Sequence, residues 1–459
     1  MPGVPTPIYL TEEIRRLEEK SAQVAPPLME RAGAAAAELA ARLVSDERKD
    51  VLVLAGPGNN GGDARIAAAR LREQFFRVTI VTRPDELPPA ARWSLVIDGL
   101  FGIGLARDVD GDYARLIDYV NQQSCPVLAL DIPSGLASDT GRVRGRAVHA
   151  THTITFIALK PGLLTLDGPD HCGEITVADL GLDTQRAGAW VASPELFKEA
   201  LRPRPHNFHK GMAGSVAVFG GAAGMTGAAL LAGRAALKLG AGRVYLGLLD
   251  TGLLVDPGAP ELMIRHADDA LGLDLDAMVV GPGLGTGERA ETLVGAALAS
   301  ELPCVLDADA LNLISESEDL RKACARRTAE TLLTPHPAEA ARLLGSTTAA
   351  VQEDRVKAAR LLSQNLNAHV VLKGAGSIVV ARDGHWFINC TGHAGLASAG
   401  TGDVLAGFLG ALLAQRYSGE SALVLGVHLH GAAAEGLPHV GLAAGELIEP
   451  ARRLWNSWL

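Results

Sequence analysis

The sequence predicts an α/β protein made of two successive domains, on three observations. The chain has 459 residues, whereas a single domain usually holds about 100 to 200. Short β-branched runs alternate with Ala- and Leu-rich segments of helical period from residue 50 to about 177, and again from residue 215 onward. This alternation is typical of parallel sheets flanked by helices. Residues 191–211 interrupt it with three prolines, so we place the boundary near residue 205 and expect domains 1–204 and 205–459.

The elements of the first half follow from this pattern in order. Two helices are expected first, over Glu12–Lys20 and Pro27–Leu43. The clearest strands after them are Val51–Ala55, Arg77–Val81, Leu95–Asp98 and Pro126–Asp131. A helix over Ala64–Gln74 is expected to follow the first of these strands.

The second half repeats the alternation and then becomes almost wholly helical. Its clearest strands are Ser215–Phe219, Ala277–Val280, Cys304–Leu306, Thr331–Leu333 and Val370–Lys373. A helix ending near Leu239 follows the first strand, and two helices over Gly402–Gln415 and Gly419–Gly436 form the last third.

Composition and charge exclude several classes of function. A net charge of −10 argues against nonspecific binding of nucleic acid, so local amides, helix N-termini or a few cations must hold any phosphate ligand. The five cysteines show no pairing or spacing that suits zinc and are expected to be free thiols. Met1–Leu10 lacks the features of a signal peptide, and the apolar run Val404–Ala414 is about half of a membrane span. We therefore expect a cytoplasmic protein without membrane contact.

Three successive strand ends in the first half carry glycine-rich loops with polar residues. They are Gly56–Asp63, Asp98–Gly104 and Asp131–Gly135. A glycine-rich turn from strand to helix lets backbone amides approach a pyrophosphate, and open α/β sheets bind ligands at the carboxyl ends of their strands. Each loop taken alone is also explained as a tight turn with a capping aspartate. Their joint occurrence predicts a binding site.

Together these loops closely resemble the NAD(P)H-hydrate epimerase family over about residues 10 to 200. The resemblance implies a Rossmann-like three-layer domain, with Asp131 as the catalytic acid/base. It also implies a K⁺ site formed by Asn60, Asp98 and Ser134. The residues that it implies to contact the hydrate are Asn59, Asn60, Gly61, Gly62, Asp63, Gly102, Ile103, Gly104, Leu105, Ala106, Arg107 and Asp108. The chain has Ala64-Arg65 where the family commonly continues with glycine, which puts the local loop geometry in question.

The second half contains loops of the same kind at its strand ends. Small residues in Met225–Ala229 permit close approach of a ligand or of another helix. Val279–Gly285 ends a strand in flexible backbone, and Leu306–Asn312 ends the next with two carboxylates that suit either a metal or a structural cap. His336 stands between two prolines, which hold it outside regular structure. Lys373 at a strand end before glycines is a candidate phosphate partner.

The sharpest chemical signal is Gly400-Thr401-Gly402-Asp403 at the start of an apolar helix. Consecutive amides at a helix N-terminus form an anion hole for the charge that develops during phosphoryl transfer. Asp403 is placed to take the proton from an attacking hydroxyl. A capped helix with a glycine-rich entrance is the structural alternative. The spacing of a Walker loop is absent.

These features resemble the ribokinase-like superfamily, and within it the ADP-dependent NAD(P)H-hydrate dehydratase family, over about residues 205 to 455. The matching segments are His209–Gly211, Pro260–Met263, Gly281–Gly285, Asp307–Asn312, His336–Glu339 and Ala399–Gly407. The resemblance implies a ribokinase-like α/β domain with Asp403 catalytic and with Ala228, Gly285 and His336 at the hydrate. It implies an adenine nucleotide held by Lys373, Gly374, Ala375, Gly376, Ser377 and Gly402. His393-Ala394 stands where the family often has Asn-Pro.

The two resemblances together predict a bifunctional enzyme that repairs NADHX and NADPHX, the hydrated forms of NADH and NADPH. The first domain is expected to interconvert R and S epimers with K⁺, and the second to dehydrate the S form with ADP and Mg²⁺, releasing AMP and phosphate. A homo-oligomer, a tetramer or larger, is implied in the same way. Two alternatives stay open: a ribokinase-like small-molecule kinase in the second domain, and a noncatalytic binding module in the first. The sequence leaves the choices between ADP and ATP, and between NADHX and NADPHX, undecided.

Overall fold

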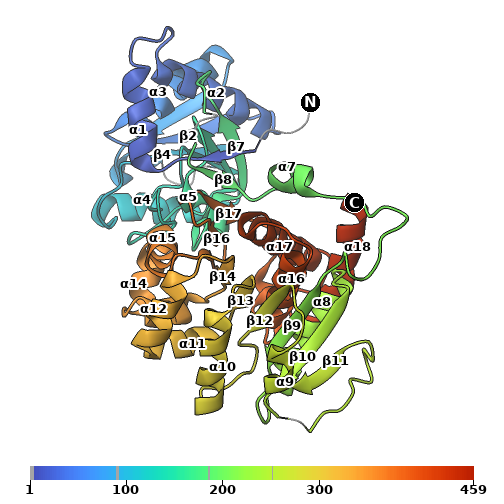
Figure 1. Ribbon diagram of the computed structural model, residues 1–459. Helices are drawn as coiled ribbons and strands as arrows, with labels where there is room; N and C mark the ends of the chain where they lie inside the picture. Colours follow the sequence, from blue (N-terminus) through green and yellow to red (C-terminus); the bar gives the residue numbers. More distant parts are fainter. Residues whose placement is uncertain (1–4, 89–91, 185–186, 251) are drawn as a thin grey trace. The chain divides into compact units, whose positions relative to one another are not determined.

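The chain folds into two compact units, which the computed structural model describes over residues 5–88, 92–184, 187–250 and 252–459 (Figure 1). The N-terminal unit comprises residues 6–190 and the C-terminal unit residues 191–459. Both are layered α/β structures with helices on both faces of a mainly parallel sheet.

The N-terminal unit contains a six-stranded parallel sheet in the order β3-β2-β4-β5-β6-β7. The six strands of this sheet are β2 (Asp50–Ala55), β3 (Arg77–Val81), β4 (Leu95–Gly99), β5 (Val127–Leu130), β6 (His152–Phe156) and β7 (Glu174–Ala178). Two short strands lie outside it: β1 (Pro7–Ile8) and β8 (Ala189–Val191), which reaches the boundary between the units. Its helices are α1 (Thr11–Lys20), α2 (Leu28–Leu43), α3 (Asn59–Glu73), η1 (Pro84–Glu86), α4 (Gly111–Asn121), α5 (Pro161–Leu164) and α6 (Gly168–Cys172).

Alternate residues of these strands bury against helices on opposite faces. Val51 and Val53 of β2 belong to the hydrophobic cluster that includes α2 and α3. Leu52 and Leu54 belong to a second cluster with α4. Because successive side chains of a strand point to opposite faces, this arrangement makes the three-layer structure that was predicted.

Helix α3 begins earlier than the sequence indicates. It starts at Asn59 rather than Ala64, so the residues expected in a loop form its first turn. Glycine permits this, because a Cβ on Gly61 would lie 1.9 Å from the carbonyl oxygen of Gly56. The close packing of this turn on the end of β2 points the amides of α3 into the site described below.

The sheet of the C-terminal unit runs in the order β17-β16-β15-β14-β13-β12-β9-β10-β11. β16 and β17 are antiparallel to their neighbours, and the strands from β15 to β11 are parallel. The strands are β9 (Ser215–Gly220), β10 (Arg243–Leu248), β11 (Met263–His266), β12 (Ala277–Val280), β13 (Cys304–Leu306), β14 (Thr331–Leu333), β15 (His369–Leu372), β16 (Ser377–Val380) and β17 (Trp386–Asn389).

Helices cover both faces of this sheet. The helices are α7 (Pro194–Phe197), η2 (Lys198–Ala200), α8 (Thr226–Lys238), α9 (Ala267–Leu271), α10 (Glu288–Ala299), α11 (Asp309–Glu316), α12 (Glu318–Arg326), α13 (Pro337–Leu343), α14 (Thr348–Glu353), α15 (Arg355–Leu366), η3 (Ala394–Leu396), α16 (Thr401–Ala414), α17 (Gly419–Ala434), η4 (Ala444–Leu447) and α18 (Ile448–Trp458). From Val404 onward α16 is buried on all sides, because it packs against α8, α17 and the sheet. This burial explains why its sequence is apolar all round.

Residues 191–204, which the sequence pattern groups with the first half, pack in the C-terminal unit. Phe197 is buried against the rings of His428 and Trp458. The imidazole Nδ1 of His428 lies 3.0 Å from the carbonyl oxygen of Ala192. The assignment of one activity each to residues 1–204 and 205–459 stays a prediction.

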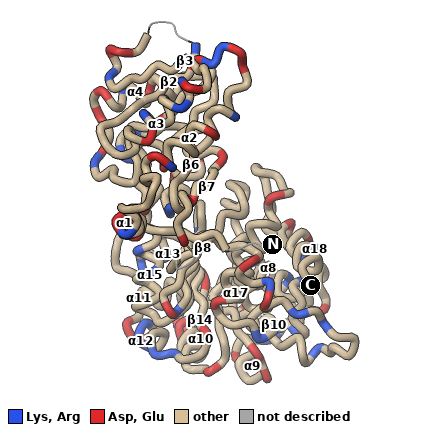
Figure 2. Tube along the Cα trace, turned by 90° about the horizontal axis from the view of Figure 1, so that it is seen from above, with Lys and Arg blue, Asp and Glu red and all other residues tan. Residues whose placement is uncertain are grey.

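Acidic and basic residues are interspersed along the outer helices and loops of both units (Figure 2). In the described part of the chain, no helix is long and apolar enough to cross a bilayer.

Candidate active sites

A cavity of about 300 Å³ opens at the carboxyl ends of the strands in the N-terminal unit. Residues of α1, of the first turn of α3 and of the loops after β4, β5 and β6 line it: Ile14, Arg15, Glu18, Pro57, Gly58, Asn59, Asn60, Asp63, Leu100, Phe101, Gly102, Ile103, Gly104, Leu105, Asp131, Phe156 and Ile157. The three loops singled out in the sequence therefore meet in one place, as expected for parallel strands.

Asp131 is fixed in this cavity by an unusual backbone and a buried lysine. Its φ of +66° is rare outside glycine, asparagine and aspartate. Lys160 is fully buried and its Nζ donates to Asp131 Oδ1 at 2.5 Å, to Thr155 Oγ1 at 2.8 Å and to the Phe156 carbonyl at 2.8 Å. The ammonium group thus orients the Asp131 carboxyl group, so Lys160 is a positioning residue.

Two further carboxyl groups share the cavity. Burial, together with the charges of Asp131 and Glu18, raises the pKa of Asp63 to about 8. Burial and the charge of Asp131 also raise the pKa of Glu18. At neutral pH Asp63 is therefore protonated and can donate a proton in the cavity that it shares with Asp131.

Asn60, which lines this cavity, is buried, as are Asp98 and Ser134. Asp98 accepts from the Ser134 hydroxyl at 2.6 Å, from the Ser134 amide at 2.8 Å and from the Leu100 amide at 3.2 Å. Burial nevertheless raises the pKa of Asp98. Both side-chain polar atoms of Asn60 are buried without a hydrogen-bond partner, which is costly unless a ligand or ion pairs with them.

The predicted contact residues divide into two groups. Asn59, Asn60, Asp63 and Gly102 to Leu105 line the cavity, whereas Gly61 and Gly62 pack within the first turn of α3. Ala106, Arg107 and Asp108 are exposed and lie outside the lining. Arg65 donates to the Gly56 carbonyl at 3.1 Å and so supports the loop. Glu18 and Lys160 were not singled out in the sequence. Lys160 follows a strand that was not predicted, and its place between Leu159 and Pro161 after an apolar run is the signal that could have identified it.

In the C-terminal unit, Asp307, Lys373 and Asp403 converge at the ends of β13 and β15 and at the start of α16. Lys373 Nζ donates to Asp307 Oδ1 at 3.0 Å. A Cβ on Gly402 would lie 3.3 Å from Lys373 Nζ and 3.8 Å from Asp307 Oδ2. Burial lowers the pKa of Lys373, but the charges of Asp307 and Glu339 outweigh it and raise the pKa overall. The ammonium group therefore stays charged beside the amides that begin α16.

Asp403 lies within this group in the first turn of α16. Burial, followed by the charge of Asp307, raises its pKa to about 6, against the lowering effect of Lys373. A carboxyl with a pKa near the working pH is suited to accept a proton during reaction.

The pH dependence of the C-terminal activity tests this property. Because the raised pKa leaves Asp403 protonated at low pH, kcat/KM for the phosphoryl-transfer reaction is expected to fall about tenfold per pH unit below about 6. A plateau is expected above pH 7. Initial rates between pH 4.5 and 8, corrected for a blank without protein, measure it. A flat profile across this range would contradict the role of Asp403 as base.

Gly285 lies in the loop after β12, close to the residues that precede α8 and to the first residue of α11. Its amide donates to Asp309 Oδ2 at 2.7 Å, so Asp309 fixes the loop after β12. A Cβ on Gly285 would lie 3.5 Å from Ala222 and 3.7 Å from Met225. In the same loop, a Cβ on Gly283 would lie 3.2 Å from that of Ala228. The predicted contact residue Ala228 thus lies against the loop that carries Gly285.

His336 is held in place by Glu339 at the start of α13. Glu339 accepts from the His336 amide at 2.7 Å and lies 3.3 Å from its Nε2, while Nδ1 accepts from the Ala338 amide. Burial and the charge of Lys373 lower the pKa of His336. The ring is therefore neutral at pH 7 and faces the Lys373 region as a hydrogen-bonding group.

The loop Lys373–Ser377 turns sharply over a buried arginine. Gly374 has a φ of +141°, and a Cβ there would lie 2.7 Å from a guanidinium nitrogen of Arg355. Arg355 donates to the carbonyls of Leu372 and Lys373 at 3.3 Å, and burial lowers its pKa to about 10. The loop is therefore preformed. His393 stands at a position where the resembled family often has asparagine. Its Nε2 atom lies 2.7 Å from the Ala434 carbonyl oxygen, and its ring stacks on that of His439.

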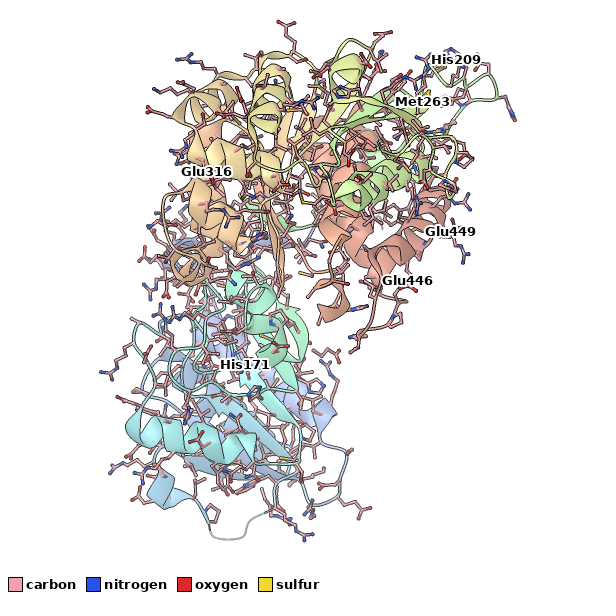
Figure 3. The ribbon with its side chains drawn as sticks, turned by 90° about the horizontal axis from the view of Figure 1, so that it is seen from below. His171, His209, Met263, Glu316, Glu446 and Glu449 are labelled. Atoms are coloured by element: carbon pink, nitrogen blue, oxygen red, sulfur yellow. The ribbon has the colours of Figure 1, made fainter. Side chains whose placement is uncertain are left out.

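Two other sequence motifs lie away from this group of residues. His209 belongs to the loop before β9, and Met263 is the first residue of β11 (Figure 3).

Comparisons with known families support both halves. The family described as NAD(P)H-hydrate dehydratase matches residues 216–446. The family described as YjeF-related protein N-terminus matches residues 26–94 and 86–162.

Relatives and solved structures agree with these matches. The bifunctional NAD(P)H-hydrate repair enzyme Nnr of Escherichia coli is 37% identical over 99% of this chain and 95% of its own length. Its counterpart from Coxiella burnetii is 36% identical over 98% and 100%. The ADP/ATP-dependent NAD(P)H-hydrate dehydratase of Bacillus subtilis, co-crystallised with ATP and Mg²⁺, covers 59% of this chain and 98% of its own with 29% identity and a TM-score of 0.53.

A ribokinase-like superfamily protein of Enterococcus faecalis shows the same fold, with a TM-score of 0.52, 24% identity, and coverage of 61% of this chain and 98% of its own. The predicted ribokinase-like architecture is thus confirmed. The chain belongs to the family of bifunctional NAD(P)H-hydrate repair enzymes.

Proposed function

We propose that the N-terminal cavity interconverts the R and S epimers of NADHX and NADPHX, and that the C-terminal site dehydrates the S epimer with ADP. The observation that carries this proposal is Asp403, a carboxyl with a pKa of about 6 at the N-terminus of α16, beside the charged Lys373. A base, an anion hole and a fixed cation in one place are the requirements of phosphoryl transfer.

In the dehydration, Asp403 removes the proton from the hydroxyl group of the S-hydrate. The hydroxyl oxygen then bonds to the terminal phosphorus of ADP, the bond from that phosphorus to the bridging oxygen breaks, and AMP leaves. The amides of Gly402 and Asp403 hold the transferring group, because amides in the first turn of a helix have no partner within it. Loss of the phosphate and of a ring proton then restores the dihydropyridine.

The nucleotide is held by the preformed loop Lys373–Ser377 and by Gly402. The charges of Asp307 and Asp309 both raise the pKa of Asp403, so three carboxyl groups lie near one another, which is the oxygen-rich surrounding that Mg²⁺ requires. They would hold Mg²⁺ together with the phosphates, and the ion would supply neutralising charge there. His336 and Gly285 are placed to contact the hydrate.

In the epimerisation, Asp131 and Asp63 act as a proton-accepting and a proton-donating group. The carbon that carries the hydroxyl is also bonded to the ring nitrogen. Removing the hydroxyl proton while a proton reaches that nitrogen breaks the C–N bond and leaves an aldehyde. Closure on its other face reverses both transfers and gives the other epimer. Lys160 keeps Asp131 oriented throughout.

The same proposal includes K⁺ bound by Asn60, Asp98 and Ser134. The residues fit, because Asn60 Oδ1 is buried without a partner and the other two groups offer a carboxylate and a hydroxyl oxygen. Oxygen ligands of this kind replace the hydration shell of K⁺. The ion would supply positive charge next to Asn60, which lines the cavity that three carboxyl groups share.

A change of monovalent cation tests this site. Epimerisation is expected to be about tenfold faster in K⁺ than in Li⁺, the size of effect that metal-site residues commonly have. Asn60→Ala is expected to remove this ratio, whereas Asn59→Ala, next to it and exposed, keeps it. Rates of R-to-S conversion followed by chromatography measure the ratio. A ratio that persists in Asn60→Ala would show that K⁺ binds elsewhere.

Incubation of the protein with NADHX tests the function as a whole. With ADP or ATP and Mg²⁺, recovery of NADH absorbance is expected, with AMP formed from ADP. A stable phosphorylated product without NADH would support the small-molecule kinase instead. The expected assembly into a tetramer or larger stays a prediction.

A further inference from the structure

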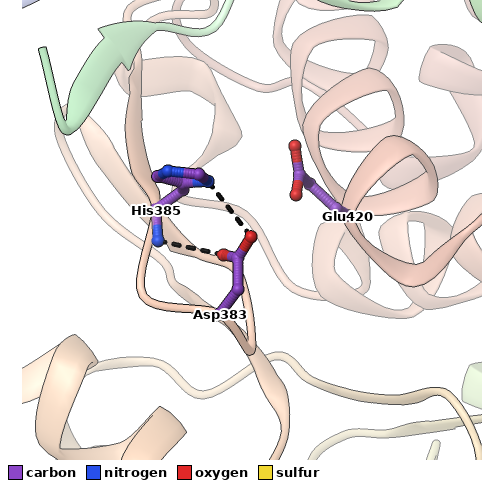
Figure 4. A group of neighbouring side chains, drawn as sticks. All are labelled: Asp383, His385 and Glu420. Carbon is purple, nitrogen blue, oxygen red and sulfur yellow. Dashed lines mark hydrogen bonds and ion pairs between the residues drawn. The ribbon is translucent and has the colours of Figure 1, made fainter. Parts of the chain in front are cut away.

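A group of potential metal ligands lies in the C-terminal unit away from the nucleotide site. Asp383 and His385 occupy the turn between β16 and β17, and Glu420 is the second residue of α17 (Figure 4). One ligand atom from each lies within 4.8 Å of the others. The group therefore brings an imidazole nitrogen and two carboxylates together from segments that are far apart in the sequence.

The geometry of two of these residues is fixed before any ion binds. Asp383 Oδ1 accepts from the backbone amide of His385 at 3.0 Å, and Asp383 Oδ2 lies 3.1 Å from His385 Nδ1 (Figure 4). The carboxylate is thus oriented toward the imidazole by the turn itself. Glu420 faces the pair from the helix, with its side chain directed into the gap between them (Figure 4). Preorganisation of this kind is what lets three side chains act as one site.

The charges in this group are not balanced by lysine or arginine. Among the described residues, neither Asp383 nor Glu420 forms an ion pair with such a side chain. Arg382, the nearest cation in the sequence, instead donates to the carbonyls of Thr328 and Ala329. The two carboxylates therefore lie near each other beside His385, with His369 also close to Glu420, an arrangement that a bound cation would stabilise.

A second layer of contacts supports the start of α17. Glu330 lies 2.9 Å from His369 Nε2, and a Cβ on Gly419 would lie 2.5 Å from Glu330 Oε2 and 2.6 Å from His369. The backbone before Glu420 is therefore packed against a buried imidazole and its carboxylate partner. Such outer contacts orient ligands in protein metal sites.

The location is distinct from the nucleotide site. Val370 at the start of β15 pairs with Val380 at the end of β16, so the turn that follows lies at the amino edge of the parallel strands. The loop Lys373–Ser377 lies at the opposite edge, after β15 ends. α17 connects the two edges. His430 lies ten residues after Glu420 on this helix, which corresponds to about 15 Å at the rise of an α-helix. The Nε2 atom of His430 lies 2.9 Å from the carbonyl oxygen of Thr401, the first residue of α16.

We propose that Asp383, His385 and Glu420 bind a divalent transition-metal ion of the Zn²⁺ class. A ligand set of one imidazole and two carboxylates suits Zn²⁺, Ni²⁺ or Mn²⁺. It suits Mg²⁺ and Ca²⁺ less well, because those ions prefer shells made of oxygen atoms alone. Zn²⁺ binds such atoms at about 2.0 to 2.2 Å, and the three ligand atoms, which lie within 4.8 Å of one another, reach a shared ion when the side chains move closer together. The exposed side leaves further positions to water. The ion connects the turn between β16 and β17 to the start of α17. It thereby stabilises the position of α17, which contacts the start of α16 through His430.

Titration of Zn²⁺ into the full chain without nucleotide tests the site by calorimetry and by the melting temperature. His385→Gln and Glu420→Gln are each expected to weaken this Zn²⁺ binding at least tenfold and to abolish the rise in melting temperature. The matched control is His266→Gln. His266 is a partly exposed histidine 3.2 Å from Asp268, but its further neighbour is Arg289 in place of a second carboxylate.

Zn²⁺ bound at other carboxylates contributes equally to all variants, so the comparison between variants decides the result. Loss in His385→Gln and Glu420→Gln with retention in His266→Gln supports the proposal. Wild-type affinity in either of the first two variants overturns it. Far-UV circular dichroism establishes that each variant is folded, as expected for substitutions outside the core.

Discussion

Replacing Asp403 by asparagine is expected to lower the rate of S-NADHX dehydration by about 10²- to 10⁴-fold, the contribution of a positioned general base. Asparagine is nearly the same size but cannot take the hydroxyl proton. The amides at the start of α16 and the Lys373–Asp307 pair stay in place, because neither depends on the Asp403 charge. Binding of ADP is therefore expected to change little.

Single-turnover rates with saturating ADP and S-NADHX measure this effect, and calorimetric titration of ADP measures nucleotide affinity. Epimerisation by the same variant is the internal control and should keep its wild-type rate. A variant that dehydrates at more than about a tenth of the wild-type rate would show that another group acts as base. The carboxylate of Asp307 would then be the next candidate, although Lys373 already occupies it.

Prediction from the sequence succeeded where a segment's own residues determine its structure. Ala277–Val280, Cys304–Leu306 and Thr331–Leu333 are strands with the bounds that were expected. Each is a short apolar run that is buried on both faces, the usual signal of a central parallel strand. The polar residues that end the strands could be assigned to one edge for the same reason, since parallel strands place their carboxyl ends together.

Prediction was weaker where tertiary packing overrides local preference. Asn59 to Gly62 are poor helix formers, so the sequence indicates a loop. The first turn of α3 forms there because Gly61 packs on the Gly56 carbonyl, with no room for a side chain. Contacts between elements decide this, and no local pattern encodes them.

The side chains that orient the catalytic groups or shift their pKa values could not be predicted from the sequence either. Lys160 reaches Asp131 only because β5 and β6 are neighbours in the sheet. Glu18 comes from α1, more than a hundred residues from Asp131, and its charge contributes to the raised pKa of Asp63. Neither relation leaves a motif in one chain segment. The chemistry of each site could be predicted from its loops, whereas the protonation states of its carboxyl groups required the structure.

The N-terminal activity is best tested with Asp131→Asn, and the backbone explains the choice. Asparagine tolerates the φ of +66° at this position, whereas alanine there is strained by about 1–3 kcal/mol. Asparagine also keeps an oxygen that can accept from Lys160, which alanine would leave buried without its anion. A loss of activity in Asp131→Asn therefore reports the missing base and not a disturbed fold.

In Asp131→Asn, R-to-S conversion is expected to slow by about 10²- to 10⁴-fold, while dehydration of pure S-NADHX keeps its wild-type rate. With a mixture of epimers and excess ADP, NADH recovery should therefore stop when the S form has been consumed, whereas the wild type continues through the R form. Chromatography of the residual hydrate identifies which epimer remains. If Asp131→Asn drained both epimers as fast as the wild type, Asp131 would not be the base. If the wild type itself left the R form untouched, the first domain would be a noncatalytic binding module.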